Sequence, residues 1–300
     1  MHLLTIKQLN ARQINEIIKI AEDLKAGRDR RRLENKTLVM LFEKPSTRTR
    51  VSFEVAMTQL GGHAIYLDFV GSQISRGETF HDTALTLSRY ADAIMARLYK
   101  HSDIMEMAKH SRAPMINGLT DLEHPCQALG DILTIKEKRK LKKKANFAYV
   151  GDCTNNMANS LMLAAAKVGM NVSLVGPAGY PPNQEYVREA KKSRVKVEFT
   201  SELAKGVRGA DVIYTDVWVS MGTEGEKSER MKAFVPYQVN EEMLSHAKKD
   251  CIVMHCLPAH RGLEITSDVI DGKHSVVWDQ AENRLHIQKA ILLYLLAKRK

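Results

Sequence analysis

Short apolar runs alternate with amphipathic helical segments along most of this chain. The first half contains four such runs that predict strands, at 37–42, 63–67, 93–97 and 114–117, and segments of helical spacing lie between them. Successive parallel strands need a crossover segment, usually a helix, so this alternation predicts a parallel sheet.

The second half repeats the alternation. Strands are expected at 146–150, 171–175, 195–199, 212–215, 251–254 and 275–278. The chain is therefore expected to be an α/β protein with two doubly wound parallel-sheet domains and an active site in the interdomain cleft, because such sheets bind ligands beyond the carboxyl ends of their strands. The expected domains are 1–140, completed by a C-terminal helix at 282–300, and 145–281.

The charge of the chain indicates a small anionic substrate. Its 300 residues carry a formal net charge of +10, and much of this charge lies in two compact runs, at 28–32 and 136–144. Neither run is interleaved with aromatic residues, and the second connects a helix to a strand, so a solvated connector is favoured over a nucleic-acid site. The remaining positive field suits a small anion.

The N-terminal residues and the cysteines indicate the cellular setting. The chain starts without a basic region followed by a long apolar stretch, and no apolar run is long enough to cross a bilayer, so a cytoplasmic protein with no membrane partner is expected. The four cysteines lack metal-ligand spacing and a Cys-x-x-Cys pair. Neither a disulfide framework nor a metal site is expected.

The segment Ser46-Thr47-Arg48-Thr49-Arg50 predicts an anion pocket. It follows a buried strand and opens a helix, so backbone N–H groups of the first helical turn are available to a phosphate. The simpler alternative is a capped helix with surface arginines. Two arginines at the positive end of a helix dipole are unfavourable unless an anion or carboxylate compensates them, which favours the pocket.

Other polar residues also follow predicted strands. Arg97 ends an apolar strand and is costly to bury without an anion, and His124 with Gln127 at a helix start can both donate to a carbonyl group. Asn155 and Asn156 either cap a helix or contact a ligand. The turn at 151–156 lacks the glycines of a dinucleotide site, so no such cofactor is expected.

Two further segments extend the candidate site. Asp216 ends a strand and leads into a glycine-containing loop, either as a capping residue or as a ligand contact. The segment His255-Cys256-Leu257-Pro258 follows another strand, where the thiol is either inert core or part of the site.

Together these segments resemble the ornithine carbamoyltransferase family. The family's phosphate signature is present as Ser46-Thr-Arg-Thr-Arg50 and its carbamoyl signature as His124-Pro-Cys-Gln127. Its ornithine signatures are present as Asp216 with Ser220-Met-Gly222, and as His255-Cys-Leu-Pro258. Aspartate carbamoyltransferases share the first two signatures but lack the Ser-Met-Gly loop. The resemblance implies domains for carbamoyl phosphate (1–140) and ornithine (145–281).

The resemblance also implies a role for each matching residue. The implied catalytic residues are Arg97, His124, Asp216 and Cys256. The implied carbamoyl phosphate contacts are Ser46, Thr47, Arg48, Thr49, Gln73, Arg97, His124, Pro125, Cys126, Gln127, Cys256, Leu257 and Arg284. The implied ornithine contacts are Asn156, with Asn155 as the alternative, Asp216, Ser220 and Met221. Gln73 resembles a loop residue that reaches a neighbouring subunit, so a homo-oligomer, a trimer or a multiple of trimers, is implied.

The implied reaction is transfer of the carbamoyl group of carbamoyl phosphate to the δ-amine of L-ornithine, giving L-citrulline and phosphate without a cofactor. This is a step of arginine biosynthesis or of the urea-cycle type, and the sequence leaves its direction in the cell open. The alternative is a carbamoyltransferase for another amine, such as putrescine or N-acylornithine. A basic nucleic-acid or scaffold protein is the rival of another class, and the intact signatures argue against it.

Overall fold

In the computed structural model the chain forms two compact units, and the model describes residues 1–139, 144–219 and 224–297. Unit 1 comprises Met1–Leu133 with Glu282–Lys300, and unit 2 comprises Thr134–Ala281. The divisions fall within α5 (Pro125–Arg139) and α12 (Val277–Leu296). In the part of the chain that is described, no helix is both long and apolar enough to span a membrane.

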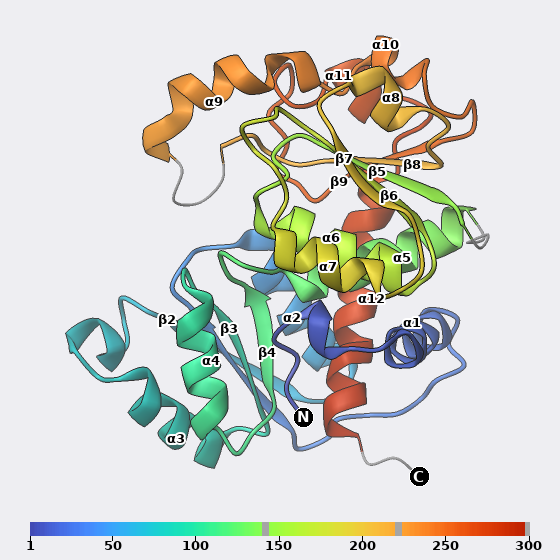
Figure 1. The fold of residues 1–300 in the computed structure, drawn as a ribbon. Helices are drawn as coiled ribbons and strands as arrows, with labels where there is room; N and C mark the ends of the chain where they lie inside the picture. Colours follow the sequence, from blue (N-terminus) through green and yellow to red (C-terminus); the bar gives the residue numbers. More distant parts are fainter. Residues whose placement is uncertain (140–143, 220–223, 298–300) are drawn as a thin grey trace. The chain divides into compact units, whose positions relative to one another are not determined.

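Unit 1 is built on a four-stranded parallel sheet with the strand order β2-β1-β3-β4. Its strands are β1 (Thr37–Phe42), β2 (His63–Asp68), β3 (Ala93–Arg97) and β4 (Met115–Leu119). The other elements assigned to unit 1 alone are η1 (Ile6–Gln8), α1 (Ala11–Lys25), α2 (Thr47–Gln59), η2 (Gln73–Arg76), α3 (Phe80–Tyr90) and α4 (His101–His110). The order reverses beside β1, so right-handed crossovers place α2 on one face of the sheet and α3 and α4 on the other (Figure 1).

Unit 2 is built on a five-stranded parallel sheet with the strand order β7-β6-β5-β8-β9. Its strands are β5 (Asn146–Val150), β6 (Asn171–Val175), β7 (Val197–Thr200), β8 (Val212–Thr215) and β9 (Ile252–His255). Its helices are α6 (Asn156–Lys167), α7 (Gln184–Lys191), α8 (Leu203–Val207), η3 (Glu224–Glu226), α9 (Lys227–Phe234), η4 (Val235–Tyr237), α10 (Glu241–Leu244) and α11 (Ser267–Ile270). The order reverses between β5 and β8. Both sheets are thus doubly wound, as the alternation of elements predicts.

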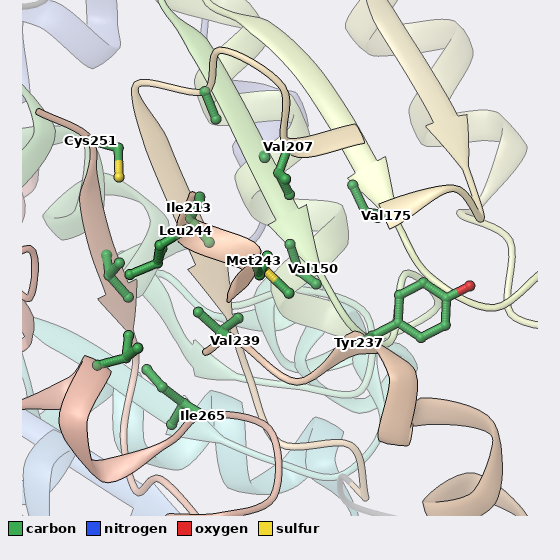
Figure 2. Packing of buried hydrophobic residues seen from close by; sticks show 14 of the residues in the cluster. Val150, Val175, Val207, Ile213, Tyr237, Val239, Met243, Leu244, Cys251 and Ile265 are labelled. Carbon is green, nitrogen blue, oxygen red and sulfur yellow. The ribbon is translucent and has the colours of Figure 1, made fainter. Parts of the chain in front are cut away.

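The core on one face of the unit 2 sheet is rich in branched aliphatic side chains. Val150, Val175 and Ile213 come from three parallel strands and cluster with Val207 of α8 and Leu244 of α10 (Figure 2). β-branched residues dominate because each strand is buried on both faces. This packing fixes the carboxyl ends of β5, β8 and β9, where the polar residues of unit 2 lie.

Several element predictions need correction. The expected strand at 275–278 is wrong, because Ser275 makes only an isolated bridge to Val253 and α12 begins at Val277. A short β-branched run is ambiguous in sequence, and here it precedes a long helix. The segment between 203 and 270 contains short helices that were not predicted.

Two basic residues after 135 are helical and pair with carboxylates. Helix α5 continues to Arg139, which forms ion pairs with Asp211 at 2.8 Å and with Asp250 at 2.6 Å. Lys138 pairs with Asp279 at 2.6 Å. Both residues therefore serve ion pairs within unit 2.

Candidate active site

The phosphate-type segment of unit 1 begins α2 as predicted. Ser46 is the N-cap, and its hydroxyl accepts a hydrogen bond from the Thr49 backbone N–H at 3.2 Å. Arg48 is half-buried, whereas Arg50 is exposed, donates to Glu54 at 3.0 Å and lies over the Tyr66 ring at 3.9 Å. Arg50 therefore makes contacts on the surface of the unit, and Arg48 remains a candidate for anion binding.

The topology of unit 1 brings a third cation to the same edge of the sheet. Phe42, the last residue of β1, is in register with Arg97, the last residue of β3, and the strand order reverses beside β1. The segment after β1 leads directly to Ser46. Arg97 and the start of α2 therefore lie at the switch point, where doubly wound sheets bind ligands.

A buried chain of hydrogen bonds connects three of the predicted residues. The Arg284 guanidinium donates to the Gln127 carbonyl oxygen at 2.5 Å and to the Thr49 hydroxyl at 3.2 Å, and all three residues are at most 4% exposed. The Gln127 amide nitrogen donates to Asp131 at 2.8 Å. Residues from α2, α5 and α12 thus meet at one point within unit 1. Asp131 was not predicted, although its spacing of four residues from Gln127 places the two on one helix face.

His124 precedes α5 and is a neutral donor or acceptor. Burial lowers its pKa well below the ordinary value, and the nearby Arg284 and Arg97 lower it further. The imidazole is therefore uncharged at neutral pH. A neutral histidine among arginines can hydrogen-bond a developing oxyanion without adding to the local repulsion between cations.

The remaining predicted residues of unit 1 have different environments. Pro125 is the first residue of α5, and Thr47 and Gln73 are exposed at the starts of α2 and η2. The Cys126 thiol is fully buried, donates to the Asn117 carbonyl at 3.4 Å, and has its pKa raised to about 12 by burial. Because its side chain is hydrogen-bonded to β4, only the backbone of Cys126 can contact a ligand.

In unit 2, Asp216 and Cys256 lie together at the ends of neighbouring strands. The Cys256 thiol donates to Asp216 Oδ1 at 3.0 Å, and the Val217 backbone N–H donates to the same oxygen at 2.8 Å. Burial raises the pKa of Asp216, partly offset by these two hydrogen bonds. This contact places the Cys256 thiol against a buried carboxylate at the carboxyl ends of β8 and β9.

His255 orients the backbone that follows it. Its Nδ1 accepts from the Leu257 N–H at 2.8 Å, so the ring proton is on Nε2, which donates to the buried Glu264 at 3.1 Å. Leu257 has a φ of 59°, a left-handed conformation that a leucine adopts only when its surroundings impose it. Asp216, His255 and Cys256 have potential metal-ligand atoms within 4.8 Å of one another. Both ring nitrogens of His255 are already engaged, so a metal would have to displace a structural bond.

The two asparagines have different positions. Asn155 is the N-cap of α6: its side-chain oxygen accepts from the Ala158 N–H at 2.8 Å, and its amide donates to the Tyr149 hydroxyl at 2.9 Å. Asn156 is the half-buried first residue of the helix. The capping role therefore belongs to Asn155, which leaves Asn156 as the candidate for ligand contact. Ser220 and Met221 lie outside the described residues.

Comparison with known proteins identifies the family. A model of the aspartate/ornithine carbamoyltransferase carbamoyl-P binding domain matches residues 1–137, and a model of the Asp/Orn binding domain of the same family matches residues 143–295. The chain belongs to the aspartate/ornithine carbamoyltransferase family. It is thus a carbamoyltransferase, as its signatures predict.

Individual members of the family are similar over almost the whole chain. An ornithine carbamoyltransferase of Archaeoglobus fulgidus is 55% identical over 99% of this chain and 98% of its own. An anabolic ornithine carbamoyltransferase of Pyrococcus furiosus is 53% identical over 97% of this chain and 94% of its own. The structure of an ornithine carbamoyltransferase from Pyrococcus furiosus matches with a TM-score of 0.94 at 52% identity, covering 100% and 98% of the two chains. An anabolic one from Campylobacter jejuni matches with a TM-score of 0.94 at 40% identity, covering 99% of each chain.

Proposed function

We propose that this chain transfers the carbamoyl group of carbamoyl phosphate to the δ-amine of L-ornithine, releasing L-citrulline and phosphate. The observation that carries the proposal is the buried Arg284 guanidinium, which joins Thr49 at the start of α2 to Gln127 on α5. It connects a phosphate-binding helix start to a group that can recognise the carbamoyl amide. Relatives of 50–55% identity that bear the name ornithine carbamoyltransferase support the choice of amine.

In unit 1 the proposed role is to hold carbamoyl phosphate and to stabilise its transition state. The start of α2, with Ser46, Thr47, Arg48 and Thr49, receives the phosphate through backbone N–H groups and charge. Arg97 and the neutral His124 stabilise the charge that develops on the carbonyl oxygen, a contribution of about 3 kcal/mol per well-placed donor.

In unit 2 the proposed role is to hold ornithine through Asn156, Asp216 and the residues around Cys256. The free δ-amine has a pKa near ~10, as a lysine does, so the enzyme must bind it with its lone pair available. The nitrogen attacks the carbamoyl carbon, a tetrahedral intermediate forms, and the bond to the phosphate oxygen breaks. The proton lost by the nitrogen leaves with phosphate, which balances the reaction.

The proposed assembly is a homotrimer or a multiple of trimers in the cytoplasm. Gln73 is exposed at the start of η2 in unit 1, which suits a residue that serves a neighbouring subunit. The proposed pathway is arginine biosynthesis, because two relatives of this chain are described as anabolic. Light scattering combined with a mixed-subunit complementation assay, using Gln73→Ala and Arg97→Ala chains, would test the assembly.

A substrate panel tests the proposed reaction. Purified protein is incubated with carbamoyl phosphate and with ornithine, putrescine or N-acetylornithine, and the ureido product of each is measured. Ornithine should be turned over at least 100-fold more efficiently than the others. A site that binds the α-amino and α-carboxylate groups of ornithine keeps unpaired polar groups when putrescine, which lacks both, is bound. Efficient turnover of putrescine with negligible turnover of ornithine would overturn the choice of amine.

A further inference from the structure

The buried carboxylate of Asp131 lies next to the carbamoyl-recognition residue Gln127. Asp131 is 0% exposed and sits four residues after Gln127 on α5. Its Oδ1 accepts a hydrogen bond from the Gln127 Nε2 at 2.8 Å. Burying a carboxylate is costly unless a donor compensates it, and the Gln127 amide supplies such a donor here.

The chemistry of the neighbours determines which way the Gln127 amide points. A guanidinium only donates, so the amide turns its oxygen to Arg284 and its nitrogen to Asp131. The same guanidinium also contacts Thr49, in the first turn of α2. The oxygen end of Gln127 therefore faces the side where the anion pocket begins.

We propose that Asp131 is a positioning residue that keeps the Gln127 carbonyl oxygen directed at the carbamoyl NH2 group, and that it thereby lets the enzyme distinguish carbamoyl phosphate from acyl phosphates. This inference rests on the proposed function. The carbamoyl group differs from an acetyl group in carrying two N–H donors where acetyl has a methyl. An amide oxygen accepts hydrogen bonds from those donors, whereas an amide nitrogen, itself a donor, would leave them unpaired.

Asp131 is needed even though Arg284 fixes the same orientation. Arg284 is itself a proposed ligand contact, so its hydrogen bonds are exchanged when the substrate arrives. Asp131 and Gln127 are on the same helix, and their contact does not depend on the substrate. The carboxylate therefore holds the amide during the step in which the guanidinium is redirected.

The test compares affinity for the substrate with affinity for its acyl analogue. Citrulline formation by the whole enzyme gives the KM for carbamoyl phosphate at saturating ornithine, and competition gives the Ki for acetyl phosphate. Asp131→Leu should raise that KM about tenfold while changing the Ki less than about twofold. Asp131→Asn keeps an acceptor oxygen and should preserve the ratio of the two constants. A parallel rise of both constants in Asp131→Leu would show a merely structural role and would overturn the proposal.

A charge-exchanged pair keeps the test decisive if Asp131→Leu does not fold. Gln127→Glu places two carboxylates in contact and should weaken carbamoyl phosphate binding strongly. Adding Asp131→Asn supplies an amide donor to the new carboxylate at position 127, and this carboxylate still offers an oxygen to the substrate. The double variant should therefore bind carbamoyl phosphate at least tenfold more tightly than Gln127→Glu alone. Additive losses would overturn the proposal. An absence of citrulline formation by the unaltered protein would instead refute the proposed function.

Discussion

Replacing Arg230 should strongly destabilise unit 2. This buried arginine pairs with Asp152, donates from Nε to the Trp218 carbonyl at 2.9 Å, and donates to Glu226 at 3.1 Å. Asp152 lies in the turn that leads from β5 to Asn156. Arg230 therefore joins the turn before one proposed ornithine contact to the connector that follows β8.

The size of the effect follows from the burial of the partner. Asp152 is 1% exposed, and in Arg230→Met its Oδ2 loses the guanidinium while Oδ1 keeps its bonds from Thr154. Removing one partner of a buried pair costs about 3–5 kcal/mol.

The loss of stability should therefore be about 3–5 kcal/mol. An exposed pair provides the control. Lys192→Met, which breaks the contact with Glu189 at 2.7 Å, should change stability by less than about 1 kcal/mol.

Urea unfolding followed by tryptophan fluorescence measures this difference. The chain has two tryptophans, and Trp278 is 63% exposed, so a Trp278→Phe background leaves the buried Trp218 as the reporter. Trp218 stacks on Phe234 at a centroid distance of 6.3 Å, within the same cluster. Adding Asp152→Asn should recover most of the loss, because the neutral amide no longer leaves a buried charge without its partner. A double variant as unstable as the single one would refute the reasoning.

Three further predictions concern the proposed substrate contacts. Arg48→Gly should raise the KM for carbamoyl phosphate more than 100-fold in a citrulline assay. The melting temperature should shift by less than about 2 °C, because the residue is half-buried and assigned to the ligand. Normal activity would contradict that assignment. Asp216→Asn should nearly abolish ornithine turnover yet stabilise unit 2 at pH 8. Burial raises the pKa of Asp216 in the folded state, so the original protein loses stability as pH rises above about 4. Denaturant titration at pH 4 and 8 would show whether the stability gained by the variant grows with pH. Cys256→Ser should raise the KM for ornithine by about tenfold in the citrulline assay, because the hydroxyl that replaces the thiol donor to Asp216 has a shorter reach.

The sequence predicted the elements that carry their own periodicity. The strands from Thr37 to Phe42 and from Val212 to Thr215 have the predicted limits, because a buried parallel strand is a short apolar run with clear ends. The run at 275–278 failed because its two adjacent valines fit a strand and a helix start equally well. Helices such as Ser267–Ile270 were missed because four residues are too few to show a helical period.

The same distinction applies to the site. Ser46 was predicted as a helix-start residue because its signal is local, and the structure shows it as the N-cap of α2. Asp131 and Glu264 were missed because a buried carboxylate is identified by its partner, and the partner of Glu264 is His255, nine residues earlier in the chain. The pairing of Arg230 with Asp152 was even harder to predict, since 78 positions in the sequence separate the two residues. Long-range pairing of this kind exists only in the folded protein.

The two units prepare the proposed reactants by opposite electrostatic means. In unit 1, burial and two arginines keep His124 uncharged, so the positive field is reserved for the phosphate and for the oxygen that becomes negative. In unit 2, an ionised carboxylate would attract the ornithine amine but would also hold it in its protonated, unreactive form. Burial raises the pKa of Asp216 and so weakens its preference for a cation, while the hydrogen bond from Cys256 keeps the carboxylate oriented. A carboxylate of intermediate strength, which binds the amine without retaining its proton, is what an attacking nitrogen requires.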